Sequence, residues 1–355
     1  MHLKTDSATE LSGIDLLGVE RQFTQLLYLD DLDKKIAENP ALKEPFEDAL
    51  DCALLDITHE AECDPQDFLF LQRILYRINR LKFFWYDDLE NYTNEGSLYL
   101  FRIQKRIESA WQDWESNFID TKPLRPEDVK EALRDRTGED LDPQPSRDNL
   151  YFRNEMTKTG YRRLLAIASL DGLVEASQLS RVLGGVGNEI QSMLTRIFFE
   201  EYGKGLLTKK HSSYFSTMLA EFKMDTQPEA YFSLAPWEVL ANINQSFFLC
   251  ERKRNFLRYI GSLLYFEISV PAAFENYKLA GERLGLSSEA VNYWELHIKE
   301  DQRHGQWMLD DVALPLVDRY PDLAWEMVYG YDQQRLISAR AGQAVARSVR
   351  EAENS

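Results

Sequence analysis

The stretch WELHIKEDQRHGQWML, residues 294–309, decides how this chain is expected to fold. His297, Asp301 and His304 follow one another at spacings of four and three residues, so at about 100° per residue they share one stripe of a helix. Apolar residues continue that stripe above and below, which predicts that the three polar side chains face the interior. A metal ion would offset the several kcal/mol that such burial costs, and imidazole with carboxylate suits iron, manganese or zinc. For this stretch alone, a hydrogen-bonded network of histidine and aspartate is the alternative.

A second helix is predicted to end with an inward-facing acid. In NEIQSMLTRIFFEEYGKG, residues 188–205, Glu201 falls at the centre of the apolar stripe. Glu200 points about 100° away and is expected on the surface. The two glycines that follow are expected to end this helix, and a new helix then carries His211. The break matters because ten residues of unbroken helix would separate Glu201 from His211 along the axis.

Two more helices place an acid where an apolar side chain is expected. Glu267 continues an apolar stripe, and Pro271 predicts a kink because it cannot donate a hydrogen bond to the Glu267 carbonyl oxygen. Glu175 lies at the centre of the stripe of an earlier helix. Asp171 is about 40° away on the same helix and is the rival for the same role.

Four helical segments therefore each turn an acid inward, and three of the five histidines accompany them. Four carboxylates with two or three histidines in a helical bundle form the ligand set of di-iron and di-manganese proteins. Zinc hydrolases use fewer carboxylates and keep a position open for water, which weighs against hydrolysis. The inward-facing candidates are Glu175, Glu201, His211, Glu267, His297, Asp301 and His304.

Composition and charge argue against several other classes of protein. The 355 residues carry a formal net charge of −18, and so acidic a surface repels the phosphates of nucleic acid and of anionic lipid. The three cysteines, Cys52, Cys63 and Cys250, form no CxxC pair and predict neither a disulfide framework nor a thiolate zinc site. The first residues lack a signal-peptide pattern, and no apolar run is long enough to span a membrane. We therefore expect a cytoplasmic protein that binds neither nucleic acid nor membrane.

Helical apolar spacing runs along almost the whole chain, without an alternating strand pattern or a hairpin signal. We expect an all-α protein with an aromatic-rich N-terminal helical region at 1–140, which would form a dimer interface, and a second domain at 150–355. Helices are expected at 67–84 and 98–118 in the first region, and the polar stretch 137–149 is expected to be a loop or linker. The helices expected after it are 154–183, 187–202, 208–222, 236–249, 252–278, 288–313 and 321–349.

The inward-facing residues resemble the ligand pattern of the haem-oxygenase-like diiron oxidases and oxygenases. These enzymes share the helical fold of haem oxygenase but bind two irons in place of haem. Their pattern is a glutamate on the first core helix, Glu and His flanking a helix break, a glutamate on a third helix, and a His-x3-Asp-x2-His helix. The matching positions in this chain are Glu175, Glu201, His211, Glu267, His297, Asp301 and His304. The resemblance covers roughly residues 150–320 and implies a haem-oxygenase-like helical bundle with an additional N-terminal helical region.

Within that family the chain looks most like the N-oxygenases of natural-product biosynthesis, such as the central domain of the streptozotocin N-nitrosating enzyme. The resemblance implies two iron ions, O2 as co-substrate, an external electron donor, and a small amine or amino acid that is hydroxylated or oxidised further at nitrogen. It also implies a homodimer. The sequence after residue 320 is helical, so the cupin domain of the streptozotocin enzyme and its second iron-dependent step are not expected.

Two other functions stay open. A related diiron oxidase would catalyse desaturation or oxidative C–C cleavage and decarboxylation, whereas a metal-free helical binding protein would keep the same residues as a structural polar core. Arg252, Arg254 and Arg258 would hold a substrate carboxylate or would form a solvated basic face.

Overall fold

The computed structural model describes residues 15–59, 64–84, 89, 92–125, 128–185 and 187–355. Cys63 and the N-terminal residues inspected for a signal peptide lie outside these ranges. The chain divides into two compact units, Met1–Phe118 and Ile119–Ser355. Within the described ranges it forms helices and no strand, which confirms the predicted all-α class. None of the described helices combines the length and the apolar composition needed to cross a bilayer.

The first unit contains α1 (Leu16–Leu27), α2 (Leu32–Glu38), α3 (Glu44–His59), α4 (Pro65–Arg80) and α5 (Leu98–Glu115). Asp15, Asp64 and Ser97 accept a backbone N–H at the start of α1, α4 and α5, which satisfies donors that a helix leaves unpaired. Phe23 and Phe46 stack in the core with ring centroids 4.5 Å apart. The helices α4 and α5 are the two that the apolar spacing predicts for this region.

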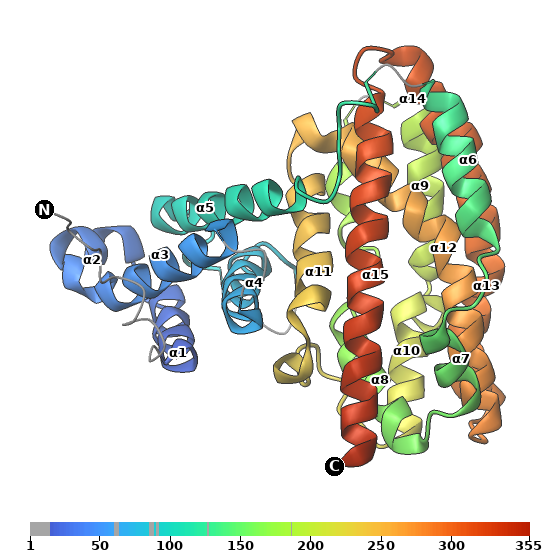
Figure 1. Cartoon of the computed structure of the whole chain (residues 1–355), viewed down its shortest axis with the longest axis horizontal. Coiled ribbons are helices and arrows are strands. Elements are labelled where there is room, and N and C mark those ends of the chain that lie inside the picture. The colour runs from blue at the N-terminus through green and yellow to red at the C-terminus, as the bar shows by residue number, and fades with distance from the viewer. Residues whose placement is uncertain (1–14, 60–63, 85–88, 90–91, 126–127, 186) are drawn as a thin grey trace, which may run out of the picture. The chain divides into compact units, whose positions relative to one another are not determined.

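The second unit is a bundle around one long central helix. Its helices are α6 (Val129–Leu141), α7 (Arg147–Asn154), α8 (Lys158–Gly172), α9 (Glu189–Glu201), α10 (His211–Glu221), α11 (Trp237–Cys250), α12 (Phe256–Arg283), α13 (Ser288–Trp307), α14 (Leu314–Arg319) and α15 (Trp325–Asn354). The central helix α12 packs against α6, α7, α11, α13 and α15. Figure 1 shows α11, α12, α13 and α15 running side by side along the unit.

The backbones of α12 and α15 touch where two glycines face the opposite helix. A Cβ atom on Gly261 would lie 1.9 Å from the Met327 carbonyl oxygen, and a Cβ atom on Gly330 would lie 1.9 Å from the Arg258 carbonyl oxygen. No side chain fits at either position, so the two glycines set the spacing between these helices. The contact holds α12, the helix that carries Glu267, against α15.

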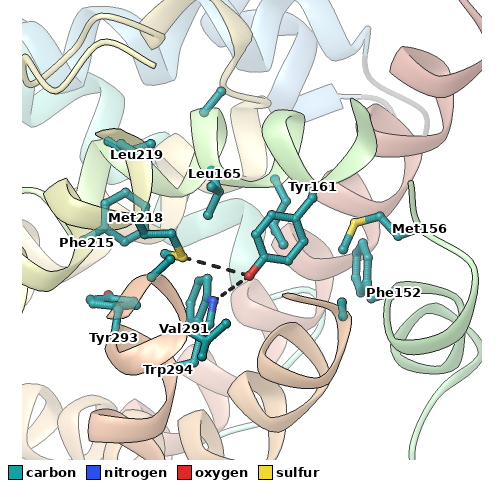
Figure 2. Packing of buried hydrophobic residues seen from close by; sticks show 14 of the residues in the cluster. Phe152, Met156, Tyr161, Leu165, Phe215, Met218, Leu219, Val291, Tyr293 and Trp294 are labelled. Atoms are coloured by element: carbon teal, nitrogen blue, oxygen red, sulfur yellow. Dashed lines mark hydrogen bonds between the residues drawn. The ribbon is translucent and has the colours of Figure 1, made fainter. Parts of the chain in front are cut away.

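A buried aromatic cluster joins α8, α10 and α13 (Figure 2). The hydroxyl of Tyr161 accepts a hydrogen bond from Trp294 Nε1 at 2.7 Å and donates to the Tyr277 carbonyl oxygen at 3.2 Å. Phe215 of α10 packs edge-on against Tyr293 of α13, with ring centroids 4.9 Å apart. Because each of these helices carries or adjoins a candidate ligand, the cluster fixes the positions of those ligands relative to one another.

The polar stretch 137–149, expected to be a loop, is a loop only at 142–146. Residues before it belong to α6 and residues after it begin α7. Tyr331 and Arg335 of α15 each donate a hydrogen bond to Asp140 at 2.8 Å, so tertiary contacts hold the last turn of α6 in place. Local composition could not reveal those partners.

One expected helix ends earlier than the apolar spacing indicates, and another changes its helical type before its expected end. The single helix expected at 154–183 is wrong, because α8 ends at Gly172 and Ala176 in the following turn has φ 60°. A left-handed residue cannot continue a right-handed helix. The helix expected at 288–313 is α-helical only to Trp307 and continues as a π-helical turn, Met308–Ala313.

Candidate metal centre

Six of the seven candidate ligands gather in two buried groups within the second unit. In each group the ligand atoms lie within 4.8 Å of one another. The first group is Glu175, His211 and His297, and the second is Glu201, Asp301 and His304. They come from the turn after α8, the end of α9, the start of α10 and one face of α13.

Glu201 lies between the two groups. Its Oε2 is 2.8 Å from Nδ1 of His211, and its Oε1 is 3.4 Å from Nδ1 of His304. Glu267, the seventh candidate, joins the second group, since its Oε2 is also 3.4 Å from Nδ1 of His304. Each of these side chains is less than a tenth exposed. A carboxylate with one oxygen toward each group occupies the position of a bridging ligand.

The loop after α9 returns the chain so that His211 meets Glu201. Gly203 has a φ of +61°, and a Cβ atom there would lie 2.3 Å from the carbonyl carbon of Lys209, so the tight return requires glycine. His211 is then the first residue of α10. The helix break predicted from the two glycines is confirmed.

Glu175 reaches the first group from a turn and not from the predicted helix. The turn follows the end of α8 at Gly172. The Tyr293 hydroxyl donates a hydrogen bond to Oε2 of Glu175 at 2.8 Å and thereby orients the carboxylate. Asp171, the rival in the sequence, belongs to neither group and lines an adjoining cavity.

The surrounding acids favour the charged form of two buried imidazoles. Burial opposes a charge on His297, but its hydrogen bond to Glu175 and the charge of Asp301 raise its pKa to about 10. Burial also opposes a charge on His304, yet the nearby carboxylates of Glu201 and Glu267 raise its pKa to about 11. Positive charge is therefore strongly stabilised here, and a cation that binds would displace these protons.

The buried carboxylates respond in opposite directions. Burial raises the pKa of Asp301 well above its usual value, and the charge of Glu267 adds to this although His297 opposes it. Burial would also raise the pKa of Glu201, but the charge and hydrogen bond of His211 hold it below its usual range. Glu201 therefore stays ionised beside His211.

The donor atoms of the centre fit iron. Among the described residues, Nδ1 of His304 and Oε1 of Glu175 are buried without a hydrogen-bond partner, a situation that costs about 1–3 kcal/mol per group. His297 donates from Nδ1 to the Tyr293 carbonyl oxygen at 2.9 Å, which leaves Nε2 toward the first group. Nitrogen and carboxylate oxygen donors without thiolate suit iron or manganese. A cation in each group would give the unpaired atoms a partner.

Glu200, expected on the surface, belongs to the centre instead. Its side chain is 11% exposed, and its Oε2 lies 3.1 Å from Nε2 of His304 and 2.5 Å from the guanidinium of Arg303. A carboxylate behind a histidine fixes the tautomer that leaves the other ring nitrogen for a metal. The predicted surface position was wrong, because the rotation along α9 could not show that α13 brings Arg303 and His304 to Glu200.

Replacing Glu200 with alanine is expected to weaken iron binding about 10–100-fold, the usual loss when the carboxylate behind a ligating histidine is removed. Anaerobic titration with iron(II) would measure the affinity of the variant and of the wild-type protein. Glu189→Ala, in the exposed first turn of the same helix, is the control and should bind iron as the wild type does. Unchanged affinity in Glu200→Ala would contradict the orienting role.

A cavity of about 170 Å³ adjoins the two groups and is lined by candidate ligands from both. Asp171 also lines it, together with an apolar wall that includes Phe266 and Phe274. The Asp171 side chain stays accessible to water through the cavity, while burial in the protein and the charge of Glu175 raise its pKa to about 6. Among the described residues that line the cavity there is no lysine or arginine.

The three arginines of the segment before Glu267 lie elsewhere. Arg252 and Arg254 line a different cavity, and Arg258 donates a hydrogen bond to Glu326 at 2.7 Å. A role for these arginines in binding a substrate carboxylate beside the candidate ligands is therefore not supported.

Comparison with known proteins agrees with the helical fold and the family resemblance. Residues 162–334, which contain all seven candidate ligands, match the family model described as iron-containing redox enzyme. A nitrosourea synthase of Streptomyces achromogenes subsp. streptozoticus is 29% identical over 169 residues. That alignment covers 47% of this chain and 36% of the relative, so the chain spans about a third of the relative's length. Residues 162–334 therefore form a domain of the haem-oxygenase-like family of iron-containing redox enzymes.

Proposed function

We propose that this protein is a non-haem diiron N-oxygenase that uses O2 to oxidise the nitrogen of a small amine or amino acid. The observation that carries the proposal is the position of Glu201, with one carboxylate oxygen toward each of two buried ligand groups. The family match supports iron and redox chemistry. The name of the relative supports chemistry at nitrogen, because a nitrosourea contains an oxidised nitrogen.

The proposed ligands divide between two ions. One ion would be held by Glu175, His211 and His297, the other by Glu267, Asp301 and His304, with Glu201 shared. When bound, the two irons supply the redox chemistry that activates O2, with electrons from an external donor. The chain itself orients the ligands: Tyr293 hydrogen-bonds Glu175 and His297, and Glu200 hydrogen-bonds His304. A homodimer and a separate reductant remain part of the proposal.

The cavity beside the ligands favours a small cationic amine as the substrate. Asp171 offers a carboxylate to it, and with a pKa of about 6 this group is mostly ionised at pH 8. A substrate carboxylate would meet no lysine or arginine among the described lining residues. The volume of about 170 Å³ is also below the roughly 300–1,000 Å³ of sites for drug-sized ligands, which disfavours a long fatty acid.

An amine screen with the iron-reconstituted protein tests this function. The protein is loaded with iron(II) without oxygen, then given a reductant, 18O2 and a panel of small primary amines, basic amino acids and fatty acids. Mass spectrometry should find labelled hydroxylamine, nitroso or nitro products from amines. Cleaved or desaturated products without oxidation at nitrogen would refute the N-oxygenase and favour an oxidase that acts on C–H or C–C bonds. Well under one iron per chain would favour a metal-free binding protein.

Replacing Asp171 with asparagine is expected to raise KM for the amine about 10–100-fold, because a hydrogen bond to a charged group contributes about 1.5–3 kcal/mol. Iron content should not change, since Asp171 lies outside both ligand groups. Asp171→Glu should restore part of the affinity, and Asp322→Asn, an exposed position, should have no effect. An unchanged KM, or a loss of iron in Asp171→Asn, would contradict the assigned role.

A further inference from the structure

A second cavity of about 970 Å³ lies in the second unit and shares no described lining residue with the cavity beside the metal centre. Five described cationic side chains line its wall. These are Arg181, Arg252, Lys253, Arg254 and Arg319, and the acid that lines it among the described residues is Glu251. We call it the basic cavity.

The charge of this wall is opposite to the charge of the chain. The whole sequence has 59 acidic and 41 basic residues, whereas the basic cavity gathers five cations beside one described carboxylate. The first turn of α9, which includes Ile190 and Gln191, opens into the same cavity. A helix N-terminus carries partial positive charge, so it adds to the potential of the side chains. Both contributions favour an anion.

The cations differ in how firmly they are held. Arg252 donates a hydrogen bond to the Phe248 carbonyl oxygen at 3.2 Å, and its guanidinium lies 4.9 Å from the centroid of the Phe248 ring. Lys253 and Arg254 are exposed, and within the described part of the chain neither forms an ion pair. The cavity therefore presents one anchored guanidinium and two cations that can turn toward a ligand.

The rest of the wall includes apolar side chains, and this indicates which class of anion the cavity would bind. Tyr320 and Leu323 also line the cavity, and both have large side chains that are exposed. Inorganic ions alone would leave this apolar surface uncovered, whereas an organic anion can cover it. The volume lies within the roughly 300–1,000 Å³ of sites for organic ligands.

The basic cavity and the cavity beside the metal centre are neighbours with separate walls. On α11, Cys250 lines the basic cavity and Ser246 lines the cavity beside the metal centre; on α12, Leu257 and Tyr259 divide in the same way. A ligand in the basic cavity would therefore not occupy the place of the proposed amine.

We propose that the basic cavity is a binding site for an organic anion that carries a phosphate or carboxylate group on an apolar body. Lys253, Arg254 and Arg252 hold the anionic group, with the N-terminus of α9 adding to the positive potential. The apolar body lies against Tyr320 and Leu323. This site does not depend on iron.

Isothermal titration calorimetry with octyl phosphate, octanoate, inorganic phosphate and octylammonium tests the site. Octyl phosphate or octanoate should bind one site per chain at least tenfold more tightly than inorganic phosphate, and octylammonium should not bind there. Iron-free and iron-loaded protein should give the same affinity, so this result stands apart from the outcome for the diiron function. Absence of saturable binding by both octyl anions, or equal binding of octylammonium, would overturn the proposal. If inorganic phosphate binds as tightly as octyl phosphate, the proposed contact between an apolar body and the cavity wall is refuted.

Reversing the charge of two cations of the basic cavity is the second test of the site. Lys253→Glu with Arg254→Glu should weaken binding about 30-fold or more, because two charge-assisted contacts become repulsive. The control pair Lys122→Glu and Lys158→Glu changes the net charge equally at exposed positions and should bind within twofold of the wild type. An equal loss in both pairs would show a non-specific charge effect and refute the site. Should the first pair fail to fold, Lys253→Gln with Arg254→Gln should show a smaller loss in the same direction.

Discussion

Replacing Glu201 with glutamine is expected to remove iron from both ligand groups at once and to lower turnover by about 100-fold or more. Loss of a group that only orients a ligand costs about 10–100-fold in metal affinity, so the loss of a shared ligand should exceed this. Glu201 faces His211 with one oxygen at 2.8 Å and His304 with the other at 3.4 Å. A glutamine keeps the shape but provides one weak oxygen donor and no charge, so neither group retains its full ligand set.

The measurement is iron content per chain after anaerobic reconstitution, together with the rate of amine oxidation. Glu295→Gln, an exposed position on α13, serves as the matched control and should load iron normally. The iron-free variant should melt below the iron-free wild type at neutral pH, because the fold stabilises the ionised Glu201 beside His211 and the variant loses that contribution. Retention of two irons and full turnover by Glu201→Gln would refute the shared position of this carboxylate.

Replacing Gly330 with alanine should destabilise the second unit by about 3 kcal/mol or more, at the upper end of overpacking effects. The added methyl group would lie 1.9 Å from the Arg258 carbonyl oxygen, and neither backbone can move away by changing a rotamer. For a unit of this size about 1 kcal/mol corresponds to roughly 2–4 °C, so the melting temperature should fall by about 6–12 °C. Circular dichroism during heating would measure the shift.

The same helix offers a matched control. A Cβ atom on Gly342 of α15 would meet nothing within 4 Å. Gly342→Ala should therefore raise stability by up to about 1 kcal/mol through helix propensity alone. Equal shifts for the two substitutions would mean that the contact between α12 and α15 does not limit stability.

The inward acids could be predicted because periodicity reports which residues share a stripe. Glu201 and Glu267 lie on apolar stripes and are buried, and Asp301 follows the same rule on α13. Glu175 is buried too, although it lies in a turn and not on the expected helix. Glu200 was missed, because a rotation angle describes one helix and not the neighbour that meets it. Whether these groups bind metal stays a prediction.

Helix positions could be predicted more securely than helix ends and cavities. The apolar spacing places α9, α10 and α13 correctly, because each buries a stripe against the bundle. The end of α8 depends on Ala176 adopting a left-handed conformation, which no local pattern demands of an alanine. Likewise, Asp171 and Glu175 look equivalent in the sequence, and only the packed structure shows that both line the cavity while Glu175 alone joins a ligand group.

The π-helical turn Met308–Ala313 lies between two parts of one continuous helix that face different partners. The helix before this turn must point three side chains toward the ligand groups: His297, Asp301 and His304. The helix after it must point Leu314 and Leu316 toward the core. A π turn closes over one more residue than an α turn. Deleting one residue there would restore a regular helix and rotate the downstream stripe by about 100° against the upstream one. The π turn thus rotates the second half of the helix relative to the first, so that each half can pack against its own partners.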